Sequence, residues 1–403
     1  MQLTLVTQQL MNTKQQSSCD IFCTVVDNYG DIGVCWRLAR QLANEYGMTV
    51  RLFVDDLTSF RKLCPEVIPD MPVQHSHGVE IRHWGVIFAE LVPADLVIEA
   101  FACELPERYV QAMSAQIHKP LWLNLEYLSA EDWVAGCHGL PSPHLKLPLL
   151  KYFFFPGFTP ETGGLLLERG LLAQRDAFQA DPQMQDNYWH TLHVPSRQPG
   201  EVRVSLFSYE NSALPEVLSA WETGSQAVTC LVPEGRVLPQ LAKFCGRQQL
   251  LAGDVVQQGS LRVQVLPFVE QEAYDKLLWA CDINFVRGED SCVRAQWAGR
   301  PFIWHIYPQH DGVHMKKLHA LLDLYCQGLD SESAHALNQL WERWNAGQGV
   351  STSSGQAWNQ FLLNRPILQR HARIWAQQLA TNNLALNLLD FSRKVGKIAA
   401  FEI

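Results

Sequence analysis

The amino-acid sequence predicts an α/β protein made of two halves, each a parallel sheet with flanking helices. The chain has 403 residues, more than twice the roughly 150 residues of a usual domain, which favours two domains. Hydrophobic residues make up 47% of the chain and charged residues 18%, a composition typical of a well-buried globular protein. From Cys19 onward, short apolar runs alternate with segments of helical periodicity, which is the pattern of α/β architecture.

The first half is predicted to alternate strands and helices. A helix is expected over residues 34–46, because Cys35, Leu38 and Leu42 recur at three- and four-residue steps. Gly47 is a suitable place for that helix to end. Buried strands of the parallel type are expected at residues 20–26, 49–54, 95–99 and 120–125.

The middle of the chain has a different composition. Residues 136–164 are dense in proline, glycine and aromatic residues without a steady period, which predicts a structured loop region facing a cleft. Residues 172–200 are rich in glutamine, aspartate and arginine and end in a Pro-Ser-Arg-Gln-Pro-Gly turn cluster. The domain boundary is therefore predicted within residues 172–200.

A second α/β set follows. Helices are expected over residues 213–222 and about 366–380, and strands at 202–207, 227–233, 262–266, 283–286 and 301–305. We therefore predict an N-terminal Rossmann-like domain over 19–172 and a C-terminal Rossmann-like domain over 200–377, with a last helix at about 378–403 packing back on the first. Two such halves are typical of nucleotide-binding domains paired around a cleft.

Composition and charge exclude several functional classes. Acidic residues outnumber basic ones by 41 to 32, a formal net charge of -9, which argues against general binding of nucleic acid. The start of the chain lacks the features of a signal peptide, and no apolar stretch approaches the roughly 18 residues of a membrane span. The eleven cysteines are scattered without a CxxC pair, which favours reduced thiols, a cytoplasmic location and no metal site.

The first candidate motif is an acidic loop, Asp27-Asn28-Tyr29-Gly30-Asp31-Ile32-Gly33, between a predicted strand and a predicted helix. Ligands gather at the carboxyl ends of parallel strands. Two carboxylates there suit a cationic or proton-yielding group and would repel a pyrophosphate. The structural alternative is that Asp31 caps the helix and Asp27 closes a turn.

The second motif, Arg287-Gly288-Glu289-Asp290-Ser291, has the same place in the second half. The Ser291 hydroxyl and the backbone N–H groups of a helix start form an anion site, and Arg287 adds a cationic donor. A diphosphate fits this chemistry. Glu289 and Asp290 also favour the helix dipole, so capping is their alternative role.

A third segment, residues 266–274, follows a strand in the second half. Phe268 is a candidate for stacking on a base and Gln271 for reading an amide edge, with core packing as the alternative for Phe268. Tyr209 is a comparable aromatic candidate. Motifs for acyl transfer, P-loop chemistry and zinc proteolysis are absent from the sequence.

Two strings carry a family resemblance. VVDNYGDIGVCWRLARQLA near the start and FVRGEDSCVRAQWAGRPFIWHIYPQ in the second half resemble the bacterial protein-arginine rhamnosyltransferases, which modify one arginine on translation elongation factor P. The resemblance runs in order from about residue 19 to the end. It implies a GT-B glycosyltransferase fold with two Rossmann-like domains across a cleft, and inverting transfer from dTDP-β-L-rhamnose to a guanidinium nitrogen.

The resemblance also implies roles for individual residues. Asp27 would be the general base, Asp31 would support the acceptor site, and Glu289 would be required for activity. The diphosphate would be bound by Arg287, Asp290 and Ser291, and the thymidine by Phe268, Gln271, Tyr209 and Tyr307. Because Arg287 and the helix terminus can stabilise the leaving diphosphate, we predict a metal-independent enzyme without a cofactor.

Two other functions remain open at this point. One is a nucleotide-sugar epimerase or hydrolase of the same fold that needs no protein acceptor. The other is a non-catalytic docking protein whose cleft serves recognition only.

Overall fold

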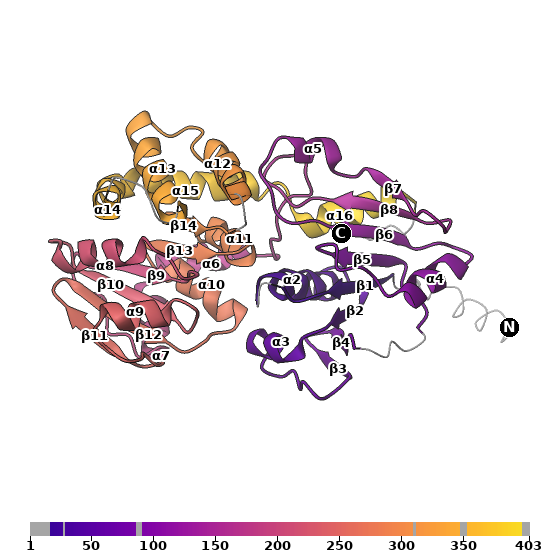
Figure 1. Cartoon of the computed structure of the whole chain (residues 1–403), viewed down its shortest axis with the longest axis horizontal. Coiled ribbons are helices and arrows are strands. Elements are labelled where there is room, and N and C mark those ends of the chain that lie inside the picture. The colour runs from indigo at the N-terminus through magenta and orange to yellow at the C-terminus, as the bar shows by residue number, and fades with distance from the viewer. Residues whose placement is uncertain (1–16, 27–28, 86–90, 309–311, 347–352, 397–403) are drawn as a thin grey trace, which may run out of the picture.

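The computed structural model of the chain describes residues 17–26, 29–85, 91–308, 312–346 and 353–396. They form two α/β halves that lie side by side (Figure 1). The elements of the first half are β1 (Ser18–Cys23), α2 (Gly30–Asn44), β2 (Thr49–Val54), α3 (Leu57–Leu63), β3 (Val73–Ser76), β4 (Val79–His83), β5 (Leu96–Ala100), α4 (Glu107–Ala115), β6 (Leu121–Leu125), α5 (Trp133–Cys137), β7 (Pro141–Pro143) and β8 (Leu150–Phe154).

The rest of the chain begins and ends with helices. Its elements are α6 (Leu171–Ala180), α7 (Pro182–Thr191), β9 (Val202–Leu206), α8 (Leu214–Thr223), β10 (Val228–Pro233), α9 (Leu238–Phe244), β11 (Val255–Gln258), β12 (Leu261–Leu266), α10 (Gln271–Ala280), β13 (Ile283–Arg287), α11 (Asp290–Ala298), β14 (Phe302–His305), α12 (Val313–Tyr325), α13 (Ser331–Asn345), α14 (Ser354–Leu363), α15 (Arg365–Leu379) and α16 (Leu384–Lys394). Among the described residues, no helix has both the length and the apolar character that a bilayer crossing requires.

The first sheet has eight strands in the order β3-β4-β2-β1-β5-β6-β8-β7. Its strands pair in parallel except for β3 with β4 and β7 with β8, which are antiparallel pairs at the two edges. Strands β5 and β6 bury every residue, because helix α4 contributes to the apolar cluster on one face and helices α2 and α16 to the cluster on the other.

The prediction for residues 136–164 is wrong in part, because this segment contains strands β7 and β8, which extend the first sheet. Prolines 141 and 143 are tolerated because β7 is an edge strand.

The segment of residues 172–200, in which the domain boundary is predicted, is largely helical. Leu171, Phe178 and Trp189 of helices α6 and α7 pack into the core of the second half.

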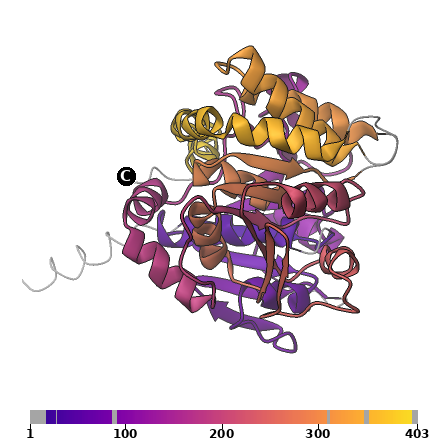
Figure 2. The same cartoon turned by 90° about the vertical axis from the view of Figure 1, so that its left-hand side faces the viewer.

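The second sheet has six strands in the order β11-β12-β10-β9-β13-β14, all parallel except β11. Helices α13, α14 and α15 gather on one side of this sheet, as the two orthogonal views show (Figures 1 and 2). Their aromatic side chains reach the core: the rings of Trp344 and Trp358, together with Trp221, lie 4.6 to 6.3 Å from that of Phe285. Much of the tryptophan content therefore stabilises the second half.

The chain crosses between the halves twice, and the two crossings are hydrogen-bonded to each other. The N–H of Leu165 donates to the carbonyl of Asn382 at 3.1 Å, and the N–H of Leu384 donates to the carbonyl of Leu165 at 2.9 Å. Gly164 has φ +79°, and a Cβ there would lie 2.2 Å from the Asn382 oxygen, so only glycine fits this crossing. Beyond it, helix α16 buries four residues in the core of the first half: Leu384, Ala385, Leu388 and Leu389.

The loops that follow strands β1, β5 and β6 of the first sheet share a cavity with the loops that follow strands β13 and β14 of the second. The carboxyl ends of the two sets of parallel strands therefore face each other. This is the GT-B arrangement, with two Rossmann-like halves on either side of a cleft, and it positions the candidate site.

Candidate active site

Among the cavities where the halves meet, two are lined by Gly30, the first residue of helix α2. We name them after one residue of each. The Arg287 cavity, of about 60 Å³, is lined by Tyr29, Gly30, Leu63, Phe207, Pro233, Phe268, Val269, Gln271, Tyr274, Arg287, Asp290 and Ser291. The Glu289 cavity, of about 260 Å³, is lined by Val26, Gly30, Asp31, Phe101, Tyr127, Leu128, Gly288, Glu289, Trp304, Ile306, Tyr307, His314 and Lys317.

Arg287 ends strand β13, and its side chain is held in the Arg287 cavity by aromatic rings. Its guanidinium carbon lies 4.6 Å from the ring centroid of Phe207 and 4.7 Å from that of Tyr209, which are cation–π distances. Burial, with Arg287 nearby, lowers the pKa of His305 from 6.5 to about 3. The positive charge of this site therefore comes from Arg287, since His305 is neutral at physiological pH.

Ser291 lies in the first turn of helix α11, beside Arg287. Its hydroxyl oxygen accepts a hydrogen bond from the backbone N–H of Arg287 at 3.0 Å and donates to the carbonyl of the same residue. The side chain therefore ties the helix start to the end of strand β13. The backbone N–H groups at the start of α11 add partial positive charge at the part of the Arg287 cavity that Asp290 and Ser291 line. This part of the cavity therefore has the chemistry of an anion site.

The acidic stretch predicted as a loop is partly helical, because helix α2 already begins at Gly30. Phe268 and Gln271 contact its described residues. The ring of Phe268 lies 5.0 Å from that of Tyr29, and the Gln271 Nε2 donates to the carbonyl of Gly33 at 3.0 Å. The Oε1 of Gln271 accepts from Arg40 at 3.2 Å. Both side chains thus link the two halves, and a base held by Gln271 would have to replace these hydrogen bonds.

The Glu289 cavity brings together Asp31, which the sequence assigns to a cationic group, and Glu289, which the resemblance makes necessary for activity. Asp31 is buried, and its Oδ2 accepts from the N–H of Val26 at 2.8 Å. Glu289 precedes helix α11 without capping it; its Oε2 instead accepts from the N–H of Leu128 in the first half at 3.0 Å. Asp27 lies outside the described residues, so its predicted role stays a prediction.

The two tyrosines assigned to the thymidine are absent from the lining of the Arg287 cavity, which Phe268 and Gln271 line. Tyr307 is 45% exposed and lines the Glu289 cavity. Tyr209 is buried, with its ring edge-on to that of Tyr307 at 5.5 Å. The structure thus places Phe268 and Gln271 in one cavity and Tyr307 in the other, with Tyr209 between Arg287 and Tyr307.

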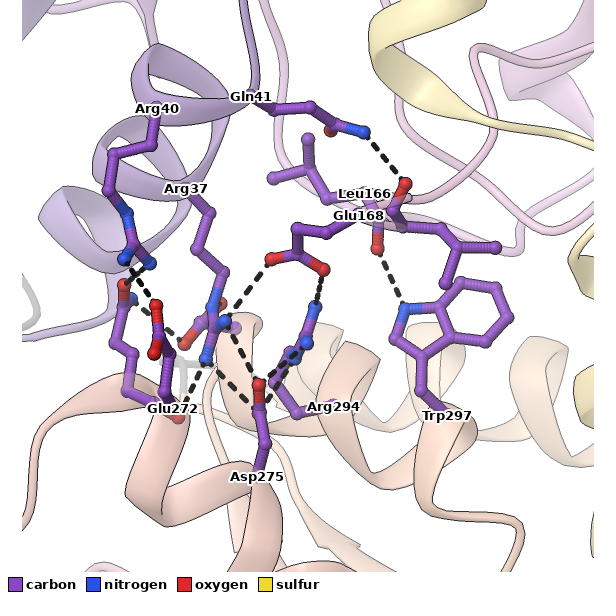
Figure 3. A network of polar contacts seen from close by, with 12 residues as sticks. Arg37, Arg40, Gln41, Leu166, Glu168, Glu272, Asp275, Arg294 and Trp297 are labelled. Carbon is purple, nitrogen blue, oxygen red and sulfur yellow. Dashed lines mark hydrogen bonds and ion pairs between the residues drawn. The ribbon is translucent and has the colours of Figure 1, made fainter. Parts of the chain in front are cut away.

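Sequence reasoning missed a buried ion network that joins the halves (Figure 3). Arg37 of helix α2 reaches three carboxylates: Asp290 at 2.9 Å, Asp275 at 3.2 Å and Glu168 at 3.3 Å. Arg294 binds Asp275 and Glu168, each at 2.7 Å. Arg37 in helix α2 and Arg294 in helix α11 each lie among buried neighbours. An arginine among the apolar positions of a helix was therefore the feature of the sequence that could have indicated this network.

The pKa values of two carboxyl groups in the network, Glu168 and Asp290, are shifted in opposite directions. Burial raises the pKa of Glu168, but Arg294 and Arg37 outweigh it and lower that pKa to about 2. At Asp290 burial has the larger effect and raises the pKa, although Arg37 and Arg294 oppose it. Asp290 thus both pairs with Arg37 in the ion network and lines the Arg287 cavity.

One group of described residues has side chains close enough to share a metal ion: Cys64, Glu66 and His77. Ser76 already links them, since its hydroxyl donates to Glu66 at 2.6 Å and lies 2.7 Å from the His77 Nδ1. None of these residues lines the Arg287 or the Glu289 cavity.

A family model described as Elongation-Factor P (EF-P) rhamnosyltransferase EarP matches residues 19–393, nearly the whole chain. This chain belongs to that family. The EarP family model begins one residue after the start of strand β1 and ends within helix α16, so it spans both halves of the cleft.

Curated and solved members of the EarP family agree with this assignment. A protein-arginine rhamnosyltransferase of Pseudomonas putida is 52% identical over 379 residues, covering 94% of this chain and 99% of that one. One of Shewanella oneidensis is 45% identical over 399 residues, covering 95% and 100%. A solved structure, "Structural basis for EarP-mediated arginine glycosylation of translation elongation factor EF-P", is 38% identical with a TM-score of 0.67, covering 94% and 99%. The chain is thus a glycosyltransferase.

Proposed function

We propose that this enzyme transfers L-rhamnose from dTDP-β-L-rhamnose to an arginine side chain of elongation factor P, with inversion at the anomeric carbon and in the cytoplasm. One observation carries the proposal. Two cavities meet at Gly30: one is lined by Asp31 and Glu289 together with Lys317, and the other by Arg287 and Ser291 together with Asp290. The two carboxylates of the first suit a cationic acceptor, and the guanidinium and helix start of the second suit an anionic donor.

The acceptor requires activation because arginine has a pKa above about 12 and delocalised lone pairs. A buried carboxylate holds the guanidinium by charge-assisted hydrogen bonds and accepts a proton as the nitrogen attacks. We propose that Asp27 is the carboxylate that accepts this proton. The residues before it are held in place, since Val25 donates to Asp55 at 2.9 Å and Val26 to Asp31 at 2.8 Å.

The leaving group of the donor is dTDP, so negative charge develops on the β-phosphate as its bond to the sugar breaks. Arg287, the Ser291 hydroxyl and the N–H groups at the start of helix α11 stabilise that charge. This is the task that a divalent metal performs in many transferases, and we therefore propose a reaction without a metal or another cofactor.

The decisive experiment is intact-mass spectrometry of elongation factor P after incubation with this protein and dTDP-β-L-rhamnose. We expect a gain of one deoxyhexose per molecule and, by NMR of the glycopeptide, an α-linked sugar. A β-linked product would contradict inversion. Conversion of the sugar nucleotide without any gain on elongation factor P would favour an epimerase or hydrolase instead.

Asp27→Asn tests the base. We expect this variant to lose transfer while calorimetry shows an unchanged affinity for the donor. If the folded variant loses donor binding as well, Asp27 is not the base but part of the donor site.

A further inference from the structure

The loop after strand β5 has an unusual backbone. Phe101, Ala102 and Glu104 have φ values of +56°, +54° and +53°. Only two other non-glycine residues among those described have a positive φ, His77 and His193. Three such residues within four positions form a strained segment, and strain of this kind is retained where a fixed geometry is needed.

Strand β6 holds this loop in place. The N–H of Phe101 donates to the carbonyl of Leu125 at 2.7 Å, and the N–H of Ala102 donates to the Asn124 Oδ1 at 3.1 Å. The N–H of Cys103 closes the turn on the Ala100 carbonyl at 3.2 Å. The position of the Phe101 ring is therefore set by backbone hydrogen bonds as well as by side-chain packing.

The fixed ring forms one wall of the Glu289 cavity. Phe101 stacks on Tyr127, with ring centroids 4.7 Å apart and planes 24° apart. Both rings line the same cavity as Asp31 and Glu289. A cation already lies near this wall, because the Lys317 Nζ is 5.9 Å from the centroid of the Tyr127 ring.

We propose that Phe101 and Tyr127 form an aromatic wall against which the acceptor guanidinium packs while the carboxylates of the cavity bind its edges. This inference rests on the proposed function and names the side chains that select arginine. A guanidinium is planar and stacks on aromatic rings, whereas the compact ammonium of lysine gains less from such a surface.

The test uses Tyr127→Leu and Phe101→Gly, the second of which removes the ring and relieves the positive φ. Steady-state kinetics should show the KM for elongation factor P raised by about tenfold in each, the scale of a partly desolvated cation–π contact. Calorimetry should show the affinity for dTDP-β-L-rhamnose unchanged within about twofold. Tyr127→Phe keeps the ring and should recover most of the loss, which a role of the hydroxyl would not allow.

Tyr46→Leu is the matched control, because Tyr46 is a half-buried aromatic residue of the same half that lines neither cavity. An unchanged acceptor KM in both ring variants overturns the inference. So does a loss of donor affinity with the acceptor KM unchanged, which would mean that the rings contact the sugar. If the unaltered enzyme does not modify elongation factor P at all, the proposed function fails, and the two failures are thus distinct.

Discussion

The Nε of Arg37 lies 2.9 Å from the Oδ1 of Asp290, although the two residues are 253 positions apart. The contact joins helix α2 of the first half to the start of helix α11, where we place the diphosphate. A residue that the sequence assigns to the donor is therefore also the partner of a buried arginine from the opposite half. If Asp290 binds the donor as proposed, the same carboxylate also joins the two halves.

Arg37→Gln should destabilise the protein strongly. The substitution leaves Asp275, Asp290 and Glu168 with one cation fewer in a buried site, and breaking a buried pair in this way costs about 3–5 kcal/mol. Urea unfolding measures the loss. Arg61→Gln is the control, because Arg61 is exposed on helix α3, and such surface substitutions usually change stability by no more than about 0.5 kcal/mol. Equal losses in the two variants would contradict a stabilising network.

Asp31→Ala should reduce kcat without weakening the donor complex. The substitution removes the carboxylate that accepts the hydrogen bond from the Val26 N–H, so the segment before Asp27 is held less firmly. It also removes one of the carboxylates proposed to bind the arginine of elongation factor P. We expect kcat to fall by about 100-fold or more, the scale of a misplaced general base. Asp56→Ala is the control: it removes the N-cap of helix α3, which should cost about 1 kcal/mol of stability and leave kcat unchanged.

Arg287→Ala and Ser291→Ala should chiefly weaken binding of the sugar nucleotide. The first removes the cation of the Arg287 cavity, and the second frees the backbone of Arg287 from the start of helix α11. Loss of a charge-assisted contact to phosphate corresponds to an increase of about tenfold in the donor Kd, measured by calorimetry. The exposed Lys243 of helix α9 provides the control Lys243→Ala. Unchanged donor affinity in both site variants would reject this diphosphate site.

Acidification should destabilise the protein through His305. Its pKa is lowered from 6.5 to about 3 by burial and by Arg287, so between these values the unfolded chain binds a proton that the folded one does not. Stability contributed by neutral His305 is present above about pH 6.5 and is lost as the pH falls toward about 3. Between about pH 7.5 and about pH 5.5 the loss is about 1.4 kcal/mol.

Urea unfolding at these two pH values measures this loss, and His305→Phe should reduce it. The exposed His118, replaced in the same way, shows whether any histidine has the effect. A pH dependence that survives in His305→Phe would assign the loss to other groups.

Chelation should leave the reaction intact. In the proposed mechanism Arg287 and the start of helix α11 would supply the positive charge for the leaving diphosphate, so we expect the initial rate in excess EDTA to stay within about twofold of the untreated rate. Recovery of a lost rate on adding Mg²⁺ or Mn²⁺ would contradict this prediction.

Local pattern predicted the alternation of strands and helices because their buried faces are apolar and regular. It failed for strand β8, whose exposure changes along its length without a clean alternation. It failed also for helix α7, where Trp189 is the one buried residue on a polar element. Helices that bury so little leave no period in the sequence.

The loops of the candidate site could be predicted because each follows a strand and carries residues of one chemistry. Their partners could not. Leu128, which donates to Glu289, is 161 residues away from it, and the Gly33 carbonyl bound by Gln271 is 238 residues away. Such pairs depend on how the two halves pack, which no local pattern encodes.

The paired crossings at Leu165 and Asn382 have a mechanical consequence. A single connecting segment would let one half swivel freely relative to the other. Two crossing segments that are hydrogen-bonded side by side restrict rotation of one half relative to the other about the axis of a single segment. Any motion that separates Arg37 from Asp290 therefore has to bend both segments together.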